Sequence, residues 1–405
     1  MKVCCIVLQE RYEAVASGVV SLIMALVSNW PPHDSKRLMV LCNKGHWAYE
    51  EFYKLKINGK IGFLEPAPFF TVSYAITRII NSARYPKMIK LLTRIIYILQ
   101  PFIYMWAVLK LRRLFIDYNV DVVFSHNGGY PGGALNRIAV IAAGIAGVEK
   151  NYMIMHNLPE PVPNLSRWRW RIEDLMVARS VNQLFSVSKT CAESLEQQRF
   201  FNISIGVIYN GIEVDHTRND LMTPSIPHWK TDVPSIIFVG EIHLRKGLNV
   251  LFDAIAGLNC KVNLVLYGGG DEAYLTQLRQ KANKLGISEQ VGFEGYHKDA
   301  AQMIQYCDLL VLPAVAYESF GMVLLEAMYW KKPVICSDHG GMKEIVIHKQ
   351  TGLIVPAGDA GALRDAIQYI LDNPTHAKQW GINGHRRLKE HFDIKLAVER
   401  YHQLI

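Results

Sequence analysis

Residues 308–338 read DLLVLPAVAYESFGMVLLEAMYWKKPVICSD, and two short apolar runs enclose a longer segment in this stretch. The runs at 308–313 and 333–338 are continuous and apolar, as expected of strands that are buried on both faces of a parallel sheet. The segment between them is expected to open a helix near Gly321. Strand, helix and strand in this order predict a parallel sheet, because parallel neighbours need a crossover connection.

The same alternation extends outward over all 405 residues. Helical patterns, for instance at 248–258 and 362–374, separate the apolar runs. The second half of the chain is expected to hold further strands at 234–240, 260–268, 289–295 and 351–356. The first half is expected to hold strands at 2–9, 37–43, 120–126, 151–156, 183–188 and 205–210. A chain of this length exceeds what one hydrophobic core usually supports, so we expect two domains.

The segment 213–232 is polar, is interrupted by prolines and lacks periodicity, so we interpret it as a linker. An N-terminal domain is then expected over 1–212 and a C-terminal domain over 233–384. Both are predicted to be doubly wound, Rossmann-like α/β domains that face each other across a cleft. Ligands of such sheets bind beyond the carboxyl ends of the strands.

Composition excludes several classes of protein. Half of the residues are apolar and a fifth are charged, which is typical of a globular chain. The seven cysteines are scattered and none forms a C-x-x-C pair, which favours reduced thiols in a cytosolic protein over disulfides or zinc ligands. The start MKVCCIVLQE lacks the layout of a signal peptide and is expected to be a strand.

Two glutamates in the opening stretch are the first candidates for chemistry. Glu318 lies in the loop and Glu326 lies two turns into the helix, so about 12 Å separates them along the helix axis. This is about the distance from the transferred sugar to the ribose in a nucleotide-diphosphate sugar. Carboxylates accept hydrogen bonds from vicinal hydroxyls, so each glutamate could hold one sugar. Two solvated glutamates are the alternative, but a carboxylate in an apolar helix needs a partner or a place at a cleft wall.

Cations and free amides near these glutamates suggest a diphosphate. Arg245 and Lys246 follow the strand that ends at Gly240, and they precede a helix whose dipole they oppose. That arrangement is tolerable if a diphosphate lies between them and the amides, with arginine as a fork and lysine as a point charge. A solvated basic turn is the alternative. The amides expected at the start of the other helix can also hold hydroxyls or phosphate; they belong to Ser319, Phe320 and Gly321.

Glycines contribute weaker signals. Gly268 and Gly269 precede Asp271 and Glu272, which would begin a helix and repel a pyrophosphate. These glycines are expected to let a flat base lie against the backbone, or to form a plain tight turn. Gly18 follows the first strand and is expected to let the backbone approach the phosphates, although it could equally be an ordinary glycine near a helix start.

Two histidines end predicted strands of the first half, and each is followed by asparagine. His126 and His156 are therefore expected to project toward the cleft. His126 could bond a reacting sugar hydroxyl, and His156 with Asn157 could position the acceptor. The alternative for each is a structural histidine.

No group of His, Asp, Glu and Cys has the spacing of metal ligands, and no Asp-x-Asp motif occurs. We therefore expect no metal and no cofactor. The two cations and the helix amides can supply the charge that a metal would otherwise provide.

A basic, apolar segment at 76–115 suggests a further partner. No acidic residue occurs between Glu65 and Asp117. The longest uncharged stretch, 95–109, is too short to span a bilayer. Apolar faces flanked by arginine and lysine suit a helix in a membrane interface, and RWRWR at 167–171 adds another basic site. We expect an anionic membrane surface as a partner and no nucleic acid; helices that pack on the sheet are the alternative.

These motifs together resemble glycosyltransferase family 4, which has the GT-B fold. The resemblance is specific over 205–375 and rests on the E-x7-E pair Glu318 and Glu326 with the SFG that follows Glu318, and on three further segments: Gly340–Gly341 with Glu344, TGLIVPAGD at 351–359 and VIYNGIEV at 207–214. It implies transfer with retention of anomeric configuration and without a metal. It also implies that Glu318 and the following amides contact the transferred sugar, that Glu326 holds the ribose, and that a C-terminal helix at 385–405 packs back on the first domain.

One departure from the family concerns the diphosphate. Most relatives have arginine directly after the glycine of the strand that ends at Gly240, whereas this chain has Glu241. Arg245 could compensate from the other end of the loop.

The sequence predicts a transferase that moves a sugar from a nucleotide-diphosphate sugar, UDP-sugar by default, to a glycan or lipid-linked acceptor. The expected setting is synthesis of bacterial lipopolysaccharide, capsule or another cell-surface polysaccharide, in the cytoplasm at the inner face of the membrane. A nucleotide-sugar 2-epimerase, an NAD-dependent oxidoreductase and a non-catalytic donor-binding subunit remain as alternatives.

Overall fold

The stretch at 308–338 forms the predicted strand–helix–strand unit in the computed structural model. Strand β11 (Leu309–Leu312) leads to helix α12 (Met322–Tyr329) and then to strand β12 (Val334–Ser337). The two strands are parallel neighbours, with Leu310 opposite Val334 and Leu312 opposite Cys336. The structure describes residues 3–9, 18–35, 37–42, 47–66, 86–159, 162, 167–214, 227–229, 232–316 and 318–405.

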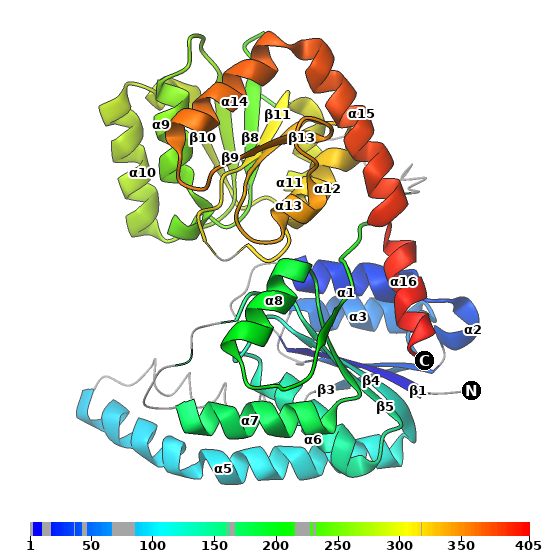
Figure 1. The fold of residues 1–405 in the computed structure, drawn as a ribbon. Coiled ribbons are helices and arrows are strands. Elements are labelled where there is room, and N and C mark those ends of the chain that lie inside the picture. Colours follow the sequence, from blue (N-terminus) through cyan, green and yellow to red (C-terminus); the bar gives the residue numbers. More distant parts are fainter. Residues whose placement is uncertain are drawn as a thin grey trace. The chain divides into compact units, whose positions relative to one another are not determined.

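Contacts divide the chain into two units (Figure 1). Unit 1 comprises Met1–Val187, Cys191–Ile208 and Val398–Ile405, and unit 2 comprises Ser188–Thr190 and Tyr209–Ala397. Most of the predicted linker at 213–232 lies outside the described residues.

Unit 1 is built on a parallel sheet with the strand order β3-β2-β1-β4-β5-β6-β7. Its strands are β1 (Val3–Gln9), β2 (Leu38–Cys42), β3 (Phe63–Pro66), β4 (Val120–Asn127), β5 (Lys150–Met155), β6 (Gln183–Ser186) and β7 (Ile205–Val207). The six strands predicted for this half are confirmed. Strand β3 was not predicted, because its four residues end at a proline and carry too short a pattern to stand out.

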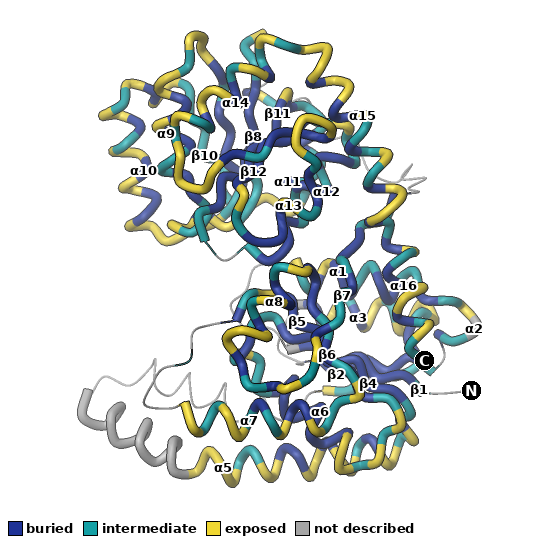
Figure 2. Tube along the Cα trace, in the orientation of Figure 1, coloured by how far each residue is buried: buried dark blue, intermediate teal, exposed yellow. Residues whose placement is uncertain are grey.

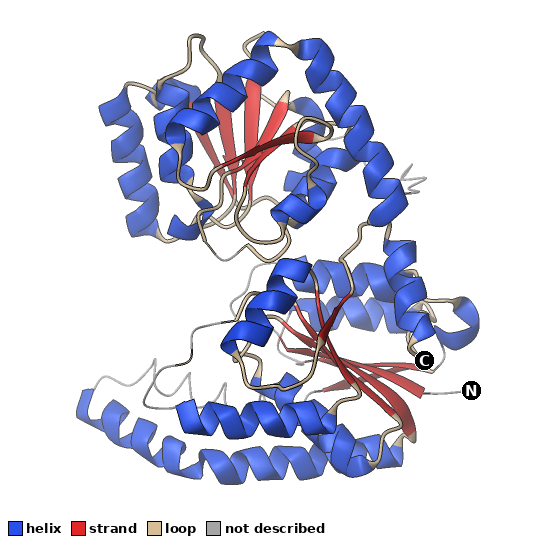
Figure 3. Cartoon of the chain, viewed as in Figure 1, coloured by secondary structure: helices blue, strands red, loops and turns tan. Residues whose placement is uncertain are grey.

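Helices cover both faces of the sheet of unit 1 (Figure 3). On one face lie α5 (Pro86–Asp117), α6 (Ala134–Ala146) and α7 (Arg167–Ser180). On the other lie α1 (Gly18–Ser28) and α3 (Trp47–Ile57). The described part of the chain before Tyr209 also contains α2 (Pro32–Ser35) and α8 (Lys189–Gln198). This double cover explains why every residue of β2 is buried and why the apolar runs are continuous.

Unit 2 repeats the design with the strand order β10-β9-β8-β11-β12-β13. The strands beyond the opening unit are β8 (Ser235–Val239), β9 (Asn263–Tyr267), β10 (Val291–Gly295) and β13 (Gly352–Val355). The helices are α9 (Leu248–Ala256), α10 (Glu272–Leu285), α11 (Ala300–Met303), α13 (Met342–Ile345), α14 (Ala360–Asp372) and α15 (Pro374–His391), with short 3₁₀ turns η2 (Leu244–Lys246), η3 (Ser288–Gln290) and η4 (Ile304–Tyr306). The six strands expected in this half are confirmed. The order reverses between β8 and β11, and ligands of such sheets bind at this kind of switch point.

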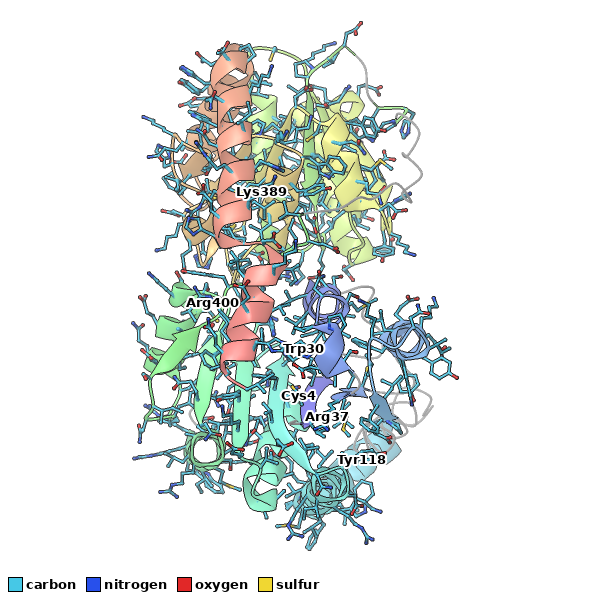
Figure 4. All side chains as sticks on the ribbon, turned by 90° about the vertical axis from the view of Figure 1, so that its right-hand side faces the viewer. Cys4, Trp30, Arg37, Tyr118, Lys389 and Arg400 are labelled. Carbon is cyan, nitrogen blue, oxygen red and sulfur yellow. The ribbon has the colours of Figure 1, made fainter. Side chains whose placement is uncertain are left out.

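The C-terminal helix expected at 385–405 is instead two helices, because α15 ends at His391 and α16 (Ile394–Gln403) begins two residues after Phe392. At the break, the Ile212 amide donates to the Phe392 carbonyl and the Ile394 amide donates to the Ile212 carbonyl. These bonds take the place of hydrogen bonds within a helix, so the helix is interrupted at this point. Figure 4 shows Lys389 on α15 and Arg400 on α16.

The last residues of α16 pack within unit 1. The Tyr401 ring lies 5.0 Å from the Phe124 ring of β4, edge to face, and the His402 ring lies 4.7 Å from the Trp30 ring. Lys150 Nζ and Tyr152 Oη donate to the carbonyls of Ile405 and Leu404.

Among the described helices, none combines the length and the apolarity that crossing a bilayer requires.

Candidate functional site

The loop after β8 holds the two predicted cations. Its 3₁₀ turn η2 begins after His243, whose ring Nδ1 accepts a hydrogen bond from the Arg245 amide. The turn ends at Gly247, which has φ 72° and leads directly into α9. Arg245 and Lys246 therefore lie just before a helix, as predicted, at the switch point of the sheet.

The loop after β11 is pressed against this turn. A Cβ on Gly247 would lie 1.9 Å from the Pro313 carbonyl oxygen, so only glycine allows the approach. The amides of Val315 and Ala316 donate to the Arg245 carbonyl at 2.8 and 3.2 Å. This backbone contact brings Glu318, which follows in the second loop, to the cations of the first.

Glu318 and the two cations form one charged cluster. Lys246 Nζ donates a short hydrogen bond to Glu318, and Arg245 Nη1 lies 3.8 Å from Glu318 Oε2. The other arginine nitrogen, Nη2, lies 2.9 Å from Glu241 Oε2. The side chains of Lys246 and Glu318 are 11% and 12% exposed, whereas that of Glu241 is 60% exposed. The cluster contains two cations and two carboxylates, so it is close to neutral, and Glu241 pairs with Arg245 rather than standing alone.

A third loop holds the backbone of Glu318 and Ser319. Gly340 has φ 68°, and a Cβ there would lie 1.9 Å from the Glu318 carbonyl oxygen; one on Gly341 would lie 2.1 Å from that of Ser319. The Gly341 amide donates to the Glu318 carbonyl at 3.1 Å. Ser188 Oγ donates to the Ser319 carbonyl at 2.6 Å. The glycine pair was known only as part of a resemblance, and its physical role is to let this loop close on the backbone of Glu318.

At the start of α12, backbone amides rather than side chains are available to a ligand. Gly321 has φ 97° and is closely surrounded, since a Cβ there would lie 3.1–3.3 Å from Leu324, Met342 and Leu312. The amides of Phe320 and Gly321 donate to no acceptor in the described part of the chain. The Phe320 ring is buried and packs 5.9 Å from the Phe392 ring. Phe320 therefore anchors the loop with its ring and leaves its amide available, as the sequence suggested.

Glu326 lies within the apolar helix α12 and is partly exposed, between the buried Leu325 and Ala327. No described residue donates a hydrogen bond to its carboxyl group. Burial raises the pKa of Glu326 from its ordinary value of 4.5 to about 7. Glu326 is thus a partly exposed carboxyl group that has lost much of its hydration and has gained no partner among the described residues.

Glu344 is a residue whose contacts the sequence did not reveal. Its carboxylate accepts hydrogen bonds from the amides of Lys189 and Thr190 at 2.9 Å each, from Thr190 Oγ1 at 2.9 Å and from Tyr209 Oη at 3.1 Å. Arg387 also donates hydrogen bonds to the backbone carbonyls of Glu344 and Ile345. All its polar capacity is used within unit 2, so Glu344 supports the site and is not free to hold a ligand.

In the glycine-rich loop after β9, one glycine packs closely against another backbone segment and the next lies beside open space. A Cβ on Gly268 would lie 1.8 Å from the Gly240 carbonyl oxygen, so both glycines serve the close approach of two backbones. At Gly269, by contrast, nothing lies within 4 Å of the position that a Cβ would take, so the space beside it is open. Asp271 caps α10 by accepting from the Tyr274 amide, as expected of a helix start. The exposed Tyr296 directly follows β10, and no sequence motif pointed to it.

The two histidines that end predicted strands are buried rather than exposed. His126 is 0% exposed and His156 is 5% exposed. His126 Nδ1 lies 3.0 Å from His156 Nε2, and the Tyr401 ring of α16 is stacked 5.7 Å from His126. The sequence could place them at strand ends but could not show that Tyr401 covers them. Burial lowers the pKa of both imidazoles, to about 3 for His156, so both are neutral near pH 7.

The buried histidine pair is left incompletely bonded. His126 Nε2 and His156 Nδ1 have no partner within the described structure. Asn157 is exposed, and its side-chain amide donates a short hydrogen bond to the Gly128 carbonyl. Gly18 is the exposed first residue of α1, and the preceding residues 10–17 lie outside the described part of the chain. Within that part, no group of three His, Cys, Asp or Glu is arranged to hold a metal ion.

Two family models match the chain. The model described as Glycosyl transferases group 1 matches residues 224–387, and the model described as Glycosyltransferase Family 4 matches residues 83–216. The first match contains the charged cluster and Glu326, and the second contains the histidine pair.

Curated relatives are similar over part of the chain. Phosphatidyl-myo-inositol mannosyltransferase of Mycobacterium leprae is 36% identical over 172 residues, which are 41% of this chain and 44% of that protein. D-rhamnosyltransferase WbpZ of Pseudomonas aeruginosa is 31% identical over 236 residues, 57% of this chain and 58% of that protein. The chain thus spans about half the length of these relatives.

Solved structures are similar over the whole chain. HepE of Anabaena in complex with UDP has a TM-score of 0.72 at 18% identity, covering 100% of this chain and 99% of that one. A glycosyltransferase from Rickettsia africae has a TM-score of 0.73 at 17% identity, covering 100% and 97%. The likeness is one of fold, and it confirms the predicted fold class of two doubly wound α/β domains.

Proposed function

Because the chain belongs to glycosyltransferase family 4, we propose that it transfers a sugar from a nucleotide-diphosphate sugar to a glycan or lipid-linked acceptor. The observation that carries this proposal is the cluster of Arg245, Lys246 and Glu318 at the switch point of unit 2. Cations for a diphosphate and a carboxylate for sugar hydroxyls are thereby held within one small volume.

Each part of the donor is assigned a partner. Lys246 and Arg245 bind the diphosphate, together with the amides of Phe320 and Gly321, which have no acceptor among the described residues. Glu318 accepts hydrogen bonds from the transferred sugar, and Glu326 accepts them from the ribose. When the diphosphate binds, it competes with Glu318 for Lys246 and with Glu241 for Arg245. These ion pairs hold the cations in position until the donor arrives.

The base is proposed to lie beside Gly269, where the surface is open, with the exposed Tyr296 near by along the same edge of the sheet. Uridine is the preferred base in this proposal. It is supported by the fold likeness to HepE of Anabaena, whose structures include complexes with UDP and with UDP-glucose.

The transfer is proposed to retain anomeric configuration and to need no metal. Two cations and the amides at the start of α12 can stabilise the negative charge that develops on the leaving diphosphate. The leaving phosphate then assists attack by the acceptor hydroxyl on the same face of the sugar. As the bond from the anomeric carbon to the phosphate oxygen breaks, the acceptor oxygen forms the new bond and its proton passes to that phosphate oxygen.

His126 and His156 are proposed to act on the sugar and acceptor side. Their unpartnered ring nitrogens, His126 Nε2 and His156 Nδ1, are what supports this role in a buried pair. Their burial means that a ligand reaches them only if the covering groups move.

The acceptor is proposed to be a lipid-linked glycan or a growing surface polysaccharide, encountered at the cytoplasmic face of a membrane. The names of two relatives support it: the phosphatidyl-myo-inositol mannosyltransferase of M. leprae and an O-antigen chain mannosyltransferase of Escherichia coli. These relatives are transferases, so the epimerase, oxidoreductase and non-catalytic alternatives are not favoured.

A thermal-shift screen of nucleoside diphosphates and their sugars tests the donor assignment. A ligand that binds only the folded protein raises its melting temperature, by an amount that grows with its concentration relative to Kd. UDP and UDP-sugars should raise it in the wild type and in a Lys378→Ala control on the exposed face of α15, and should raise it less in Lys246→Ala at the same concentration. No shift with any nucleoside diphosphate in the wild type would contradict the proposal.

A further inference from the structure

The outward faces of α5 and α7 carry several large apolar side chains that are exposed, and exposed apolar patches mark interaction sites. On α5, from Leu99 onward, the exposed apolar residues are Leu99, Phe102, Met105, Trp106, Leu109 and Ile116. On α7 they are Trp168, Ile172 and Met176. Figure 2 shows this part of α5 and the start of α7 largely as exposed tube. We call the outward face formed by these residues the α5–α7 surface.

The apolar stripe of α5 is distinct from the side that packs on unit 1. Ala107, Val108, Leu111 and Phe115 follow one another at helical spacing and are buried in the core of the unit. Phe102, Met105 and Leu109 follow at the same spacing on the opposite side, and Phe102 is 71% exposed. The helix is therefore apolar on both sides, and one apolar side has no partner in the described structure.

The acidic groups of α7 are turned away from this surface. Asp174 is fully buried and accepts two hydrogen bonds from Arg199, and Glu173 pairs with Arg137 at 2.6 Å. Both carboxylates are therefore neutralised inside unit 1. Arg167, Arg171 and Arg179 are exposed and have no acidic partner among the residues that the structure describes, and the guanidinium groups of Arg167 and Arg171 lie over the Phe200 ring.

Side-chain bonds hold the two helices together as one surface. Tyr104 Oη of α5 donates to Glu173 of α7 at 3.0 Å, and Arg169 Nη2 donates to Gln100 Oε1 at 3.2 Å. Figure 1 shows the two helices side by side on the same face of the sheet. Near the end of α5, Lys110, Arg112 and Arg113 are exposed, and the last of them faces Asp117 at 3.5 Å.

We propose that the α5–α7 surface docks on an anionic phospholipid membrane, with its apolar side chains in the interface and its cations against the headgroups. This inference deepens the proposed function, because it names the surface that would bring a lipid-linked acceptor to the enzyme. Two exposed indoles, Trp106 and Trp168, suit the amphipathic boundary of a bilayer.

Charge complementarity favours an anionic membrane as the partner of the α5–α7 surface. The surface presents Lys110, Arg112, Arg113, Arg167, Arg171 and Arg179 against one described outward carboxylate, that of Asp117. Anionic headgroups offer many negative charges to such a surface, whereas a second copy of this chain would offer the same positive ones. Apolar insertion and headgroup attraction act together, as in helices that lie in a membrane interface.

Vesicle sedimentation tests the docking surface without any nucleotide or acceptor. The wild-type chain should partition onto vesicles of phosphatidylglycerol and phosphatidylcholine, and less so at high salt or on phosphatidylcholine alone. The double variant Arg112→Glu with Arg113→Glu should weaken partitioning at least about tenfold. Phe102→Ser with Leu109→Ser should weaken it by a similar factor on the same vesicles.

Matched controls come from other faces of the chain. Ile57→Ser removes an apolar group that is 68% exposed on α3, across the sheet, and Lys378→Glu reverses an exposed charge on α15. Both should bind vesicles as the wild type does. Trp fluorescence should shift to the blue on vesicles and be quenched by brominated acyl chains, and Trp106→Phe with Trp168→Phe should reduce that quenching.

The result separates this inference from the donor assignment. All four surface residues in the two double variants lie outside the nucleotide site, so each variant should keep the UDP-induced rise in melting temperature, which also shows that it is folded. Loss of vesicle binding with that rise intact supports the docking surface. Equal binding to neutral vesicles, wild-type binding by both double variants, or sedimentation-velocity evidence that the surface pairs two copies of the chain would overturn it.

Discussion

Replacing Glu326 by glutamine is expected to stabilise the donor-free protein at pH 8 and at the same time to weaken nucleotide binding. Burial raises the pKa of Glu326 from 4.5 to about 7, and no described residue compensates its charge. The folded protein therefore holds this proton to a higher pH than the unfolded chain does. The free energy of unfolding falls as the pH rises from about 4.5 to about 7, and the loss is complete above that range.

The size of the effect follows from the same shift. A difference between 4.5 and about 7 corresponds to roughly 3 kcal/mol, at about 1.4 kcal/mol for each pH unit. Glutamine has no proton to lose, so Glu326→Gln should be more stable than the wild type by up to this amount at pH 8 and by no more than about 1 kcal/mol at pH 5. For a domain of this size the melting temperature changes by about 2–4 °C for each kcal/mol.

Nucleotide affinity should change in the opposite sense. If the ionised carboxylate accepts the ribose hydroxyls, only the ionised fraction of the protein binds well. That fraction falls about tenfold between pH 8 and pH 6 for a pKa of about 7, and the apparent Kd for UDP rises by the same factor. The phosphates of UDP also titrate, but they do so for both proteins, so the ratio of the two dissociation constants isolates Glu326.

Calorimetric unfolding and isothermal titration at pH 5, 6 and 8 measure both effects. Glu289→Gln, at an exposed position of unit 2, is the matched control and should alter neither. The reasoning is refuted on the stability side if Glu326→Gln is no more stable than the wild type at pH 8. It is refuted on the binding side if the variant binds UDP as tightly as the wild type at that pH.

Three further outcomes are expected. Lys246→Ala should weaken UDP binding at least about tenfold while uridine binding stays unchanged, since a charge-assisted hydrogen bond contributes about 1.5–3 kcal/mol; equal losses for both ligands in titration calorimetry would contradict the diphosphate role. Glu318→Ala should lower kcat at least about tenfold without weakening UDP binding, because charge develops at the sugar only in the transition state and Glu318 competes with the diphosphate for Lys246; steady-state kinetics that show a change in KM alone would reassign it. Transfer should survive EDTA, and activity that is lost in the chelator and restored by Mn²⁺ would show a metal requirement.

Much of the charged site could be expected from the sequence, because strand ends can be located from local patterns. Lys246 follows one apolar run and Glu318 follows another, and parallel strands end at the same edge of a sheet. Their direct hydrogen bond was not predicted, because it depends on the neighbouring positions of β8 and β11 and on the pressing of two loops at Gly247. The pairing of Arg245 with Glu241 likewise needed the shape of the turn.

The contacts that hold the backbone of the site in place could be seen only in the tertiary structure. Ser188 lies 131 residues before the Ser319 carbonyl to which it donates, and the Thr190 amide lies 154 residues before Glu344. Sequence periodicity reports on neighbours within a helix or strand, so it carries no signal for such contacts. The histidines show the same limit, since their positions at strand ends were correct and their burial depends on Tyr401 of α16.

By itself, the sequence determined two parallel α/β units, their strand positions and the residues near the strand ends, because buried parallel strands impose continuous apolar runs and crossover helices on the local chain. Only the tertiary structure decided which side chains meet, which carboxyl group is left without a partner, and which apolar faces are covered. Those outcomes depend on contacts between segments far apart in the chain, where burial, charge and close packing are set by the neighbours and not by the residue's own sequence context.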